Sequence, residues 1–324
     1  MLTDIRLRRN RRTPAIRDMV QETRLHPSDF VVPLFVTEGT NLAVPIASMP
    51  GIHRFTLDLL LKKIEHLAEL GIQSVALFPA IENSLRTDAA EEAWNPNGLI
   101  PRAVRAVKQH FPHVCVISDI ALDPYTSHGH DGLANAQGDV LNDETVECLC
   151  RMSCVHAESG VDIVAPSDMM DGRVRAVRRA LDAESHTHVG ILAYSAKYAS
   201  ALYGPFRDAL QTKLAFGDKK SYQMNPANVR EALLEAQLDE TEGADILLVK
   251  PALFYLDVIA RLREQTQRPI AAYHVSGEYS MVMAAAAAGY LNAEAVFQEA
   301  LLSIKRAGAD LIFTYAVETV LSRM

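Results

Sequence analysis

Residues 230–250 read REALLEAQLDETEGADILLVK, and this stretch contains the unit from which the fold can be inferred. Residues 230–242 have the length and pattern of a helix that ends at Gly243, and the apolar run Ile246–Lys250 follows. A glycine just past a helix commonly adopts the left-handed conformation that caps it. A short continuous apolar run is typical of a strand buried on both faces, as in a parallel sheet. The unit is therefore helix, glycine, strand, and similar junctions occur at Gly71, Gly160 and Gly308.

The unit repeats along the chain from residue 31. The runs expected to form strands are Val31–Val36, Ser74–Pro79, Val114–Asp119, Asp162–Pro166, Val189–Tyr194, Ile246–Lys250, Ile270–Val275 and Asp310–Tyr315. The segments with helical patterns include Leu57–Leu70, Asp143–Ser159, Arg173–Ala183, Arg230–Glu242, Leu256–Gln265 and Ala293–Ala307. This alternation predicts an α/β fold, a (β/α)8 TIM barrel over residues 31–324, preceded by an extended N-terminal arm over residues 1–30. A doubly wound sheet is the alternative, but its glycine-rich loop is missing after the first strand, where Val36-Thr-Glu-Gly39 stands.

Composition excludes several classes of protein. Of 324 residues, 49% are hydrophobic and 22% charged, which is unlike an intrinsically disordered chain. The net charge of −8 argues against a surface that coats nucleic acid. No apolar stretch approaches the ~18–20 residues of a membrane span. Four cysteines are too few and too clustered for a disulfide framework. We therefore expect a cytoplasmic protein with no nucleic-acid partner and no membrane partner.

The N-terminal arm contains a basic run, and three interpretations are open. Five arginines lie between Arg6 and Arg12, which could indicate a nucleic-acid arm or an organelle presequence. Acidic residues follow at Asp18 and Glu22, and aromatic residues are not interleaved with the arginines. We favour a surface arm that lies on a neighbouring subunit.

Two lysines at the ends of predicted strands are the strongest indication of chemistry. Active sites of such barrels lie at the carboxyl ends of the strands. The candidates at or just after those ends are Phe78-Pro79, Asp119, Ser167, Lys197, Lys250, Ser276 and Tyr315. Lys250 follows four apolar residues, and Lys197 has no carboxylate beside it in sequence. The alternative is that each lysine reaches solvent from a strand end.

A lysine amine is nucleophilic only when it is neutral. With an ordinary pKa of ~10.4, about one lysine in a thousand is neutral near pH 7. Burial together with a second ammonium nearby can lower that pKa by about 3. Two lysines that face one pocket would supply both effects, so the sequence predicts imine formation with a carbonyl substrate.

The densest polar motif runs from Ser118 to Gly132 and reads SDIALDPYTSHGHDG. Its aspartates and the pair His128 and His130 indicate a metal site, but no supporting histidine lies at another strand end. If a cation binds here, carboxylate oxygens favour magnesium over zinc. The cysteines at 148, 150 and 154 have no zinc-site spacing and are expected in the core.

The chain resembles the porphobilinogen synthase (5-aminolaevulinate dehydratase) family over essentially its whole length. Seven motifs occur in the family's order: Tyr125-Thr-Ser-His-Gly-His130, Ala193-Tyr-Ser-Ala-Lys-Tyr-Ala-Ser200, Tyr203-Gly-Pro-Phe-Arg207, Ser221-Tyr-Gln-Met224, Val249-Lys-Pro251, Val275-Ser-Gly-Glu-Tyr279 and Ile304-Lys-Arg-Ala-Gly-Ala-Asp310. The resemblance implies condensation of two 5-aminolaevulinate molecules to porphobilinogen, with loss of two waters, in tetrapyrrole (haem) biosynthesis. It also implies a homo-oligomer, usually an octamer, in which the arm embraces a neighbour.

The resemblance implies a role for each lysine. Lys250 would form the imine with the substrate that becomes the propionate side, and Lys197 would serve the second substrate. Asp119 and Ser167 would line the pocket and assist proton transfer. An imine makes the adjacent proton easier to remove because its cationic nitrogen accepts electrons, so two ketones call for two lysines.

The resemblance also implies two groups that bind substrate carboxylates. Ser276 and Tyr315 would hold the carboxylate of the first substrate. Arg207, Lys219 and Gln223 would hold that of the second. Lys219 stands where some members have an arginine, and a lysine keeps the charge but loses the bidentate fork.

Metal use is the point at which this chain departs from part of the family. Zinc-dependent members have three cysteines at the positions of Ala121, Asp123 and Asp131, so no catalytic zinc is expected here. The chain resembles the zinc-free, magnesium-responsive branch. Glu235 matches the ligand of an allosteric magnesium ion, with Asp171 in the outer shell.

Three other functions remain as alternatives. A class I aldolase would use one essential lysine and commonly a phosphate site after strands seven and eight. A metal-dependent hydrolase would use the four residues Asp119, Asp123, His128 and His130. A non-catalytic barrel would bind nucleic acid through the arginines of the arm.

Overall fold

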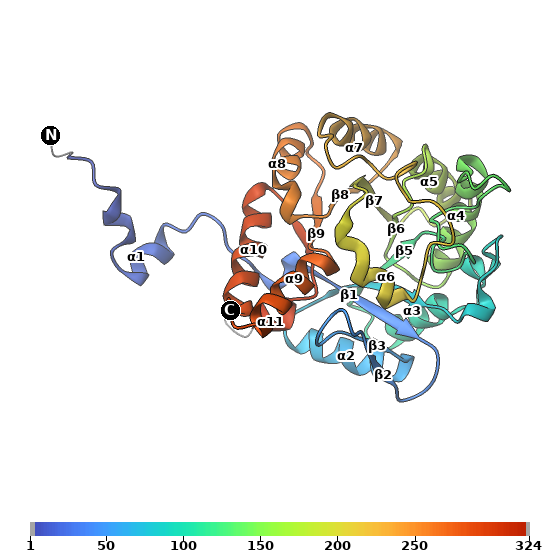
Figure 1. The fold of residues 1–324 in the computed structure, drawn as a ribbon, viewed down its shortest axis with the longest axis horizontal. Helices are drawn as coiled ribbons and strands as arrows, with labels where there is room; N and C mark the ends of the chain where they lie inside the picture. The colour runs from blue at the N-terminus through green and yellow to red at the C-terminus, as the bar shows by residue number, and fades with distance from the viewer. Residues whose placement is uncertain (1–3, 322–324) are drawn as a thin grey trace.

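Eight parallel strands form a closed barrel in the computed structural model, which describes residues 4–321 (Figure 1). The strands are β1 (Phe30–Thr37), β4 (Ser74–Ala80), β5 (Cys115–Ile120), β6 (Ile163–Pro166), β7 (Gly190–Lys197), β8 (Ile246–Lys250), β9 (Ile270–Tyr273) and β10 (Leu311–Phe313). Each pairs in parallel with the next in this order, and β10 pairs with β1 to close the ring. The predicted (β/α)8 barrel is confirmed, and the doubly wound alternative is wrong.

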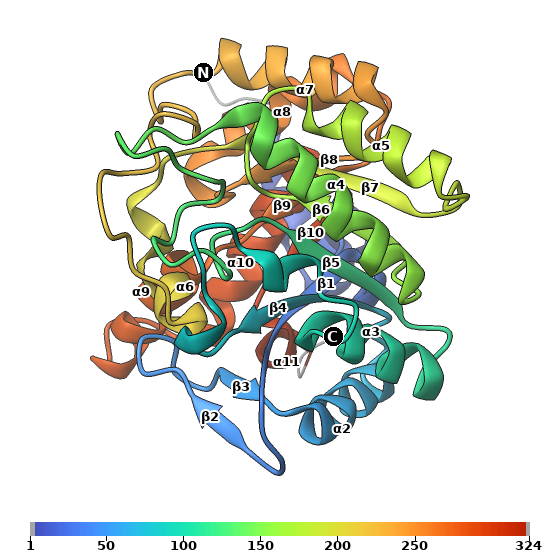
Figure 2. The same ribbon diagram turned by 90° about the vertical axis from the view of Figure 1, so that its right-hand side faces the viewer.

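Helices surround the barrel on its outside (Figure 2). They are α2 (Leu57–Glu69), α3 (Leu99–His110), α4 (Asn142–Glu158), α5 (Arg173–Ala183), α6 (Gly204–Leu210), α7 (Arg230–Glu242), α8 (Leu256–Gln265), α9 (Ser276–Ala287), α10 (Ala293–Ala307) and α11 (Val317–Leu321). The six helices predicted from sequence are present, with ends that agree within one residue. Helices α3, α6, α9 and the short α11 were not anticipated. Proline, which usually argues against a helix, lies in the first turn of α3 and of α6, where helices tolerate it. Helix α9 begins three residues after β9, and no turn signal separates the two.

The strands are buried on both faces, as their continuous apolar sequences predict. All but the last residue of β1 and all but the first of β8 are buried. Gly243 and Gly308 close α7 and α10 with φ values of 112° and 120°, which are accessible to glycine and strained for other residues. The cysteines are free; Cys148 is buried and the other three are partly buried.

One strand end differs from the prediction in a way that matters for the site. The apolar run suggested that β7 ends at Tyr194, but the strand continues to Lys197. A shift in register against β8 between Ala193 and Ala196 interrupts the alternation of side chains. As a result Lys197 and Lys250 are paired across β7 and β8.

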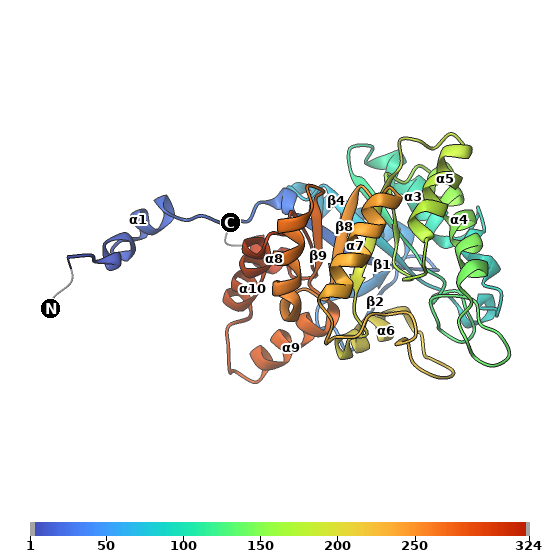
Figure 3. The ribbon, with the colours of Figure 1, turned by 90° about the horizontal axis from the view of Figure 1, so that it is seen from above.

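A hairpin and an arm complete the fold. Strands β2 (Ala43–Pro45) and β3 (His53–Phe55) are antiparallel, and β3 pairs with β1. In the arm, a 3-10 helix (Leu7–Arg11) and the short helix α1 (Pro14–Met19) have no buried residues and project away from the barrel (Figure 3). Further 3-10 helices span Pro27–Asp29, Asn83–Leu85, Glu91–Trp94, Ala201–Tyr203 and Leu253–Tyr255. No helix within residues 4–321 is long and apolar enough to cross a membrane.

Candidate active site

The two lysines at the ends of β7 and β8 face one cavity. Lys197 and Lys250 are the last residues of their strands, and each is about 95% buried, with exposures of 6% and 5%. The cavity has a volume of about 280 Å³. Side chains that line it include those of Asp123, Lys197, Tyr203, Phe206, Arg207, Lys219, Gln223 and Lys250. The carboxyl ends of the strands thus bring together two amines and further cationic side chains in a single enclosed space.

Lys250 has the electrostatic environment of a nucleophilic amine. Burial and, after it, the ammonium of Lys197 lower the pKa of Lys250 to about 7, against the opposing effect of Asp119. An amine with this pKa is about half neutral at pH 7, against about one in a thousand for an ordinary lysine. Both effects that the sequence suggested, burial and a second ammonium, therefore act on Lys250.

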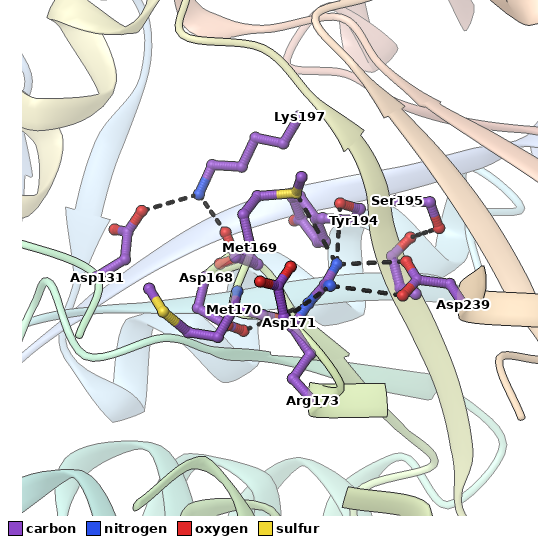
Figure 4. A network of polar contacts seen from close by, with 12 residues as sticks. Asp131, Asp168, Met169, Met170, Asp171, Arg173, Tyr194, Ser195, Lys197 and Asp239 are labelled. Carbon is purple, nitrogen blue, oxygen red and sulfur yellow. Dashed lines mark hydrogen bonds and ion pairs between the residues drawn. The ribbon is translucent and has the colours of Figure 1, made fainter. Parts of the chain in front are cut away.

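Lys197 has a different environment because it has an anionic partner. Its Nζ lies 3.3 Å from Asp131 Oδ2 (Figure 4). The same Nζ donates a hydrogen bond to the carbonyl of Ser167. The sequence places no carboxylate beside Lys197, so only the fold reveals this ion pair. For Lys197 to attack a carbonyl group, this pair has to be broken.

Asp119, at the end of β5, is a buried carboxyl group suited to proton transfer. Burial and, after it, the charge of nearby Asp123 raise the pKa of Asp119 to about 7, against the opposing effect of a hydrogen bond from the Ser167 side chain. Both lysine amines interact electrostatically with this carboxylate. A group with a pKa near the working pH can serve as both acid and base.

Lys219 is held between two aspartates. Its Nζ lies 2.7 Å from Asp131 Oδ1 and 3.3 Å from Asp123 Oδ2. Burial alone would raise the pKa of Asp131, but Lys197 and Lys219 outweigh it and hold that pKa below its ordinary value. Burial raises the pKa of Asp123, and Lys219 counteracts it in part. The ammonium expected to bind a substrate carboxylate is therefore already paired with protein carboxylates in this structure.

The other expected carboxylate-binding residues lie at two depths. Arg207, on α6, and Gln223 line the cavity, and Gln223 Nε2 donates to Asp131 Oδ2 at 3.3 Å. Ser276, the first residue of α9, is 1% exposed, and its hydroxyl has no partner among residues 4–321. The hydroxyl of Tyr315 lies 3.0 Å from that of Tyr273. Ser276 and Tyr315 are not among the residues that line the cavity, and Tyr315 is linked to it through Tyr273, whose ring faces Lys250.

A buried arginine lies behind Lys197 and holds the loop after β6. Arg173 donates to the carbonyl of Met170 at 3.1 Å and to that of Tyr194 at 3.3 Å, and it forms an ion pair with Asp239 at 3.3 Å (Figure 4). Its Nε is 3.8 Å from Asp168, next in sequence to Ser167. Because Ser167 accepts the hydrogen bond from Lys197, this network supports the position of that lysine.

The residues expected at an allosteric metal site lie in a second cavity, of about 650 Å³. Glu235 and Asp171 both line it. Burial raises the pKa of Glu235; Arg173 opposes the shift, and Asp239 and Asp171 add to it. Carboxylate oxygens of this kind suit magnesium, which is bound through one or two carboxylates and several waters.

The described part of the chain has no group of three or more histidine, cysteine, aspartate or glutamate side chains arranged to hold a metal. The ring of His130 is hydrogen-bonded to the hydroxyl of Tyr222 and to the carbonyl of Phe216. The ligand set that the hydrolase hypothesis requires is therefore not assembled from these residues.

Sequence reasoning missed the aromatic side chains around Lys250. Tyr203 and Phe206 line the cavity, and both stand in the motif Tyr203-Gly-Pro-Phe-Arg207. The motif drew attention to its arginine alone. The rings of Tyr194 and Tyr273 carry no separate signal, because both lie in strands that read as ordinary buried runs.

Comparisons with known proteins agree with this site. A family model described as "Delta-aminolevulinic acid dehydratase" matches residues 4–323. The "Delta-aminolevulinic acid dehydratase" of Chlamydia pneumoniae is 53% identical over 316 residues, which is 98% of this chain and 95% of that protein. The chloroplastic enzyme of the same name from Physcomitrium patens is 55% identical over 311 residues, 96% of this chain and 72% of that protein.

A solved structure extends the agreement to three dimensions. The delta-aminolevulinic acid dehydratase (porphobilinogen synthase) from Toxoplasma gondii ME49, in complex with the reaction product porphobilinogen, superposes with a TM-score of 0.97 at 49% identity. The match covers 99% of this chain and 92% of that one. The family expected from the seven motifs is confirmed, and the chain belongs to the delta-aminolevulinic acid dehydratase family.

Proposed function

We propose that the protein is a porphobilinogen synthase, a lyase that condenses two 5-aminolaevulinate molecules to porphobilinogen with loss of two waters in tetrapyrrole biosynthesis. One observation carries the proposal: two buried lysines, paired at the ends of β7 and β8, face a single cavity in a chain of this family. A class I aldolase would leave Lys197 without a role.

Lys250 forms the first imine. Its neutral amine attacks the ketone carbon of one substrate, a C–N bond forms as the C=O double bond becomes single, and the nitrogen gives up one proton while the oxygen takes one up. Loss of that oxygen as water, with a second proton, leaves a protonated imine. Asp119, beside the Ser167 hydroxyl and with a pKa of about 7, is suited to move these protons.

Lys197 forms an imine with the second substrate after leaving its ion pair with Asp131. Its proton has to pass to another group, and Asp119 interacts with both amines. Each imine then makes the adjacent carbon more acidic, which prepares the bond between the two substrates.

Two sets of side chains hold the substrate carboxylates. Ser276 and Tyr315 bind the one attached to Lys250; a fully buried hydroxyl without a partner is unfavourable, and a substrate oxygen would satisfy Ser276. Arg207, Lys219 and Gln223 bind the other. Lys219 and Gln223 contact Asp131 in this structure, so they turn toward the substrate when it enters.

The family is metal-dependent, using zinc or magnesium. We infer an allosteric magnesium ion at Glu235, with Asp171 in its outer shell, and no catalytic zinc. The side chain of Ala121 offers no ligand atom, and Asp123 and Asp131 are already in ion pairs with Lys219, Asp131 with Lys197 as well. Magnesium bound at Glu235 would supply a positive charge next to the carboxylates of that cavity.

We also infer a homo-oligomer, an octamer, assembled through the arm, and a cytoplasmic enzyme without nucleic-acid or membrane partners. The arm supports the first inference: its helices have no buried residue, and Leu7 and Met19 are 71% and 75% exposed in the single chain, which leaves apolar surface for a neighbouring subunit to cover. Sedimentation of the full chain beside a chain that begins at residue 21 tests it, and an unchanged mass would contradict it.

Borohydride reduction in the presence of 5-aminolaevulinate tests the chemistry. We expect the reduced imine to attach one substrate to Lys250, identified by peptide mapping, and Lys250→Ala to lose both the label and activity. Lys62→Ala, which removes an exposed lysine of the outer helix α2, is the control and keeps both. A label confined to any other lysine would overturn the assignment.

A further inference from the structure

Four aromatic rings surround the amine of Lys250. Its Nζ lies 4.5 Å from the ring centre of Tyr273, 4.8 Å from that of Phe206, and 5.2 Å from those of Tyr194 and Tyr203. These distances are within the range of cation–π contacts, in which a positive charge is attracted to the negative face of a ring. We call these four residues the aromatic cage.

No carboxylate is paired with Lys250. Within residues 4–321, its Nζ takes part in no ion pair and no hydrogen bond, although the residue is buried, with an exposed fraction of 5%. Lys197, on the same cavity, pairs with Asp131. The two amines of one site thus differ in their direct contacts: Lys197 is in an ion pair, whereas Lys250 is faced by rings, and Asp119, Asp123 and Asp131 act on it only from beyond ion-pair distance.

The rings of the cage are held in place by other contacts. The hydroxyl of Tyr203 donates to the carbonyl of Lys250 at 3.2 Å, and the hydroxyls of Tyr273 and Tyr315 are 3.0 Å apart. Phe206 packs edge-on against Phe78, with ring centres 5.3 Å apart. The ring faces are therefore already oriented toward Nζ before any substrate binds.

We propose that the aromatic cage is the counter-charge of the protonated imine at Lys250, an inference that rests on the proposed function. A carboxylate in contact with the nitrogen would hold the free amine as ammonium and would compete for the imine proton. Ring faces accept no proton. They allow the buried amine to become neutral and to attack, and they then stabilise the cation that withdraws electrons from the substrate.

Fluorination of one ring tests this role with little change of shape. Phe206 is the suitable member because it has no hydroxyl, and each fluorine on the ring weakens its negative face. We expect phenylalanines with one, two and three fluorines at position 206 to decrease stepwise the yield of borohydride-trapped substrate at Lys250, by about threefold to tenfold over the series. The pH at which trapping is half-maximal should move as well, which packing alone would not cause.

Two comparisons make the result decisive. The same fluorinated series at Phe297, a fully buried ring that stacks on Tyr279 outside the site, should leave the trapping yield unchanged. Phe206→Leu, apolar but without a ring, should resemble the most fluorinated form. A yield indifferent to fluorination at position 206 would refute the cage as counter-charge, whereas failure of the unmodified protein to form any adduct at Lys250 would refute the proposed function instead.

Discussion

Replacing Lys197 with methionine, which is similar in length but uncharged, measures how strongly one amine of the site activates the other. After burial, the Lys197 ammonium is the largest cause of the lowered pKa of Lys250. The two residues are paired across neighbouring strands, which lie about 4.8 Å apart, so their charges interact at a separation on the order of 5–8 Å. At an effective dielectric constant of about 20, this interaction amounts to about 2–3 kcal/mol.

This energy predicts a shift in the pH dependence of imine formation. About 1.4 kcal/mol corresponds to one pH unit, so Lys197→Met should raise the pKa of Lys250 from about 7 by roughly 1–2. The freed charge of Asp131 acts in the same direction. At pH 7 the neutral fraction of Lys250, and with it the rate of the first imine, should fall about fivefold to fiftyfold, while at pH 9 half or more of the amine should again be neutral.

Quenched-flow trapping with borohydride and 5-aminolaevulinate between pH 5.5 and 9.5 provides the assay. It follows the first imine and is independent of turnover, which Lys197→Met is expected to abolish. Lys62→Met on α2 serves as the control and should keep the original midpoint. A midpoint in Lys197→Met that stays near 7 or moves to lower pH would refute the argument that the two ammonium charges are coupled.

Three further predictions concern the remaining parts of the site. Asp119→Asn should flatten the pH dependence of the free energy of unfolding. The pKa of Asp119 in the folded protein is about 7, above the ordinary value of about 3.9, so the native protein loses about 2–4 kcal/mol of stability as the pH rises between these two values. Denaturation at pH 4 and at pH 8 should show this loss in the protein with Asp119 and not in Asp119→Asn. Ser276→Ala should leave the free energy of unfolding nearly unchanged, because the hydroxyl has no hydrogen-bond partner in the protein. It should nevertheless raise KM for 5-aminolaevulinate by about tenfold. An unchanged KM would argue against binding of a substrate carboxylate by Ser276. Glu235→Ala should abolish stimulation by magnesium while borohydride labelling of Lys250 persists, with Glu264→Ala on α8 as the control that keeps the stimulation.

The course of the chain through the barrel could be predicted because its signals are local. Continuous apolar runs such as Ile246–Lys250 form strands buried on both faces, and glycines such as Gly243 end the helices before them. Parallel strands place their carboxyl ends at one rim, so lysines at the ends of two of them could be expected to meet. Helix α9 escaped prediction because its sequence has no distinct apolar and polar faces and it begins only three residues after β9.

The partners of the site residues could not be predicted, because each depends on segments far apart in the chain. Asp131 neutralises Lys197 from 66 positions away, and it also holds Lys219. The shift in register inside β7, which pairs Lys197 with Lys250, depends on the contact with β8.

Amino-acid order by itself determined that this chain builds alternating strands and helices, with Lys250 at one strand end and Lys197 just beyond the apolar run of another, since hydrophobic periodicity and capping act over a few residues. Only the tertiary structure decided what surrounds each amine. Lys197 meets a carboxylate. Lys250 meets ring faces from β7, from β9, from the 3-10 helix Ala201–Tyr203 and from α6. The difference arises because charge and burial act through space, and distances across the barrel mouth are set by the closure of the sheet.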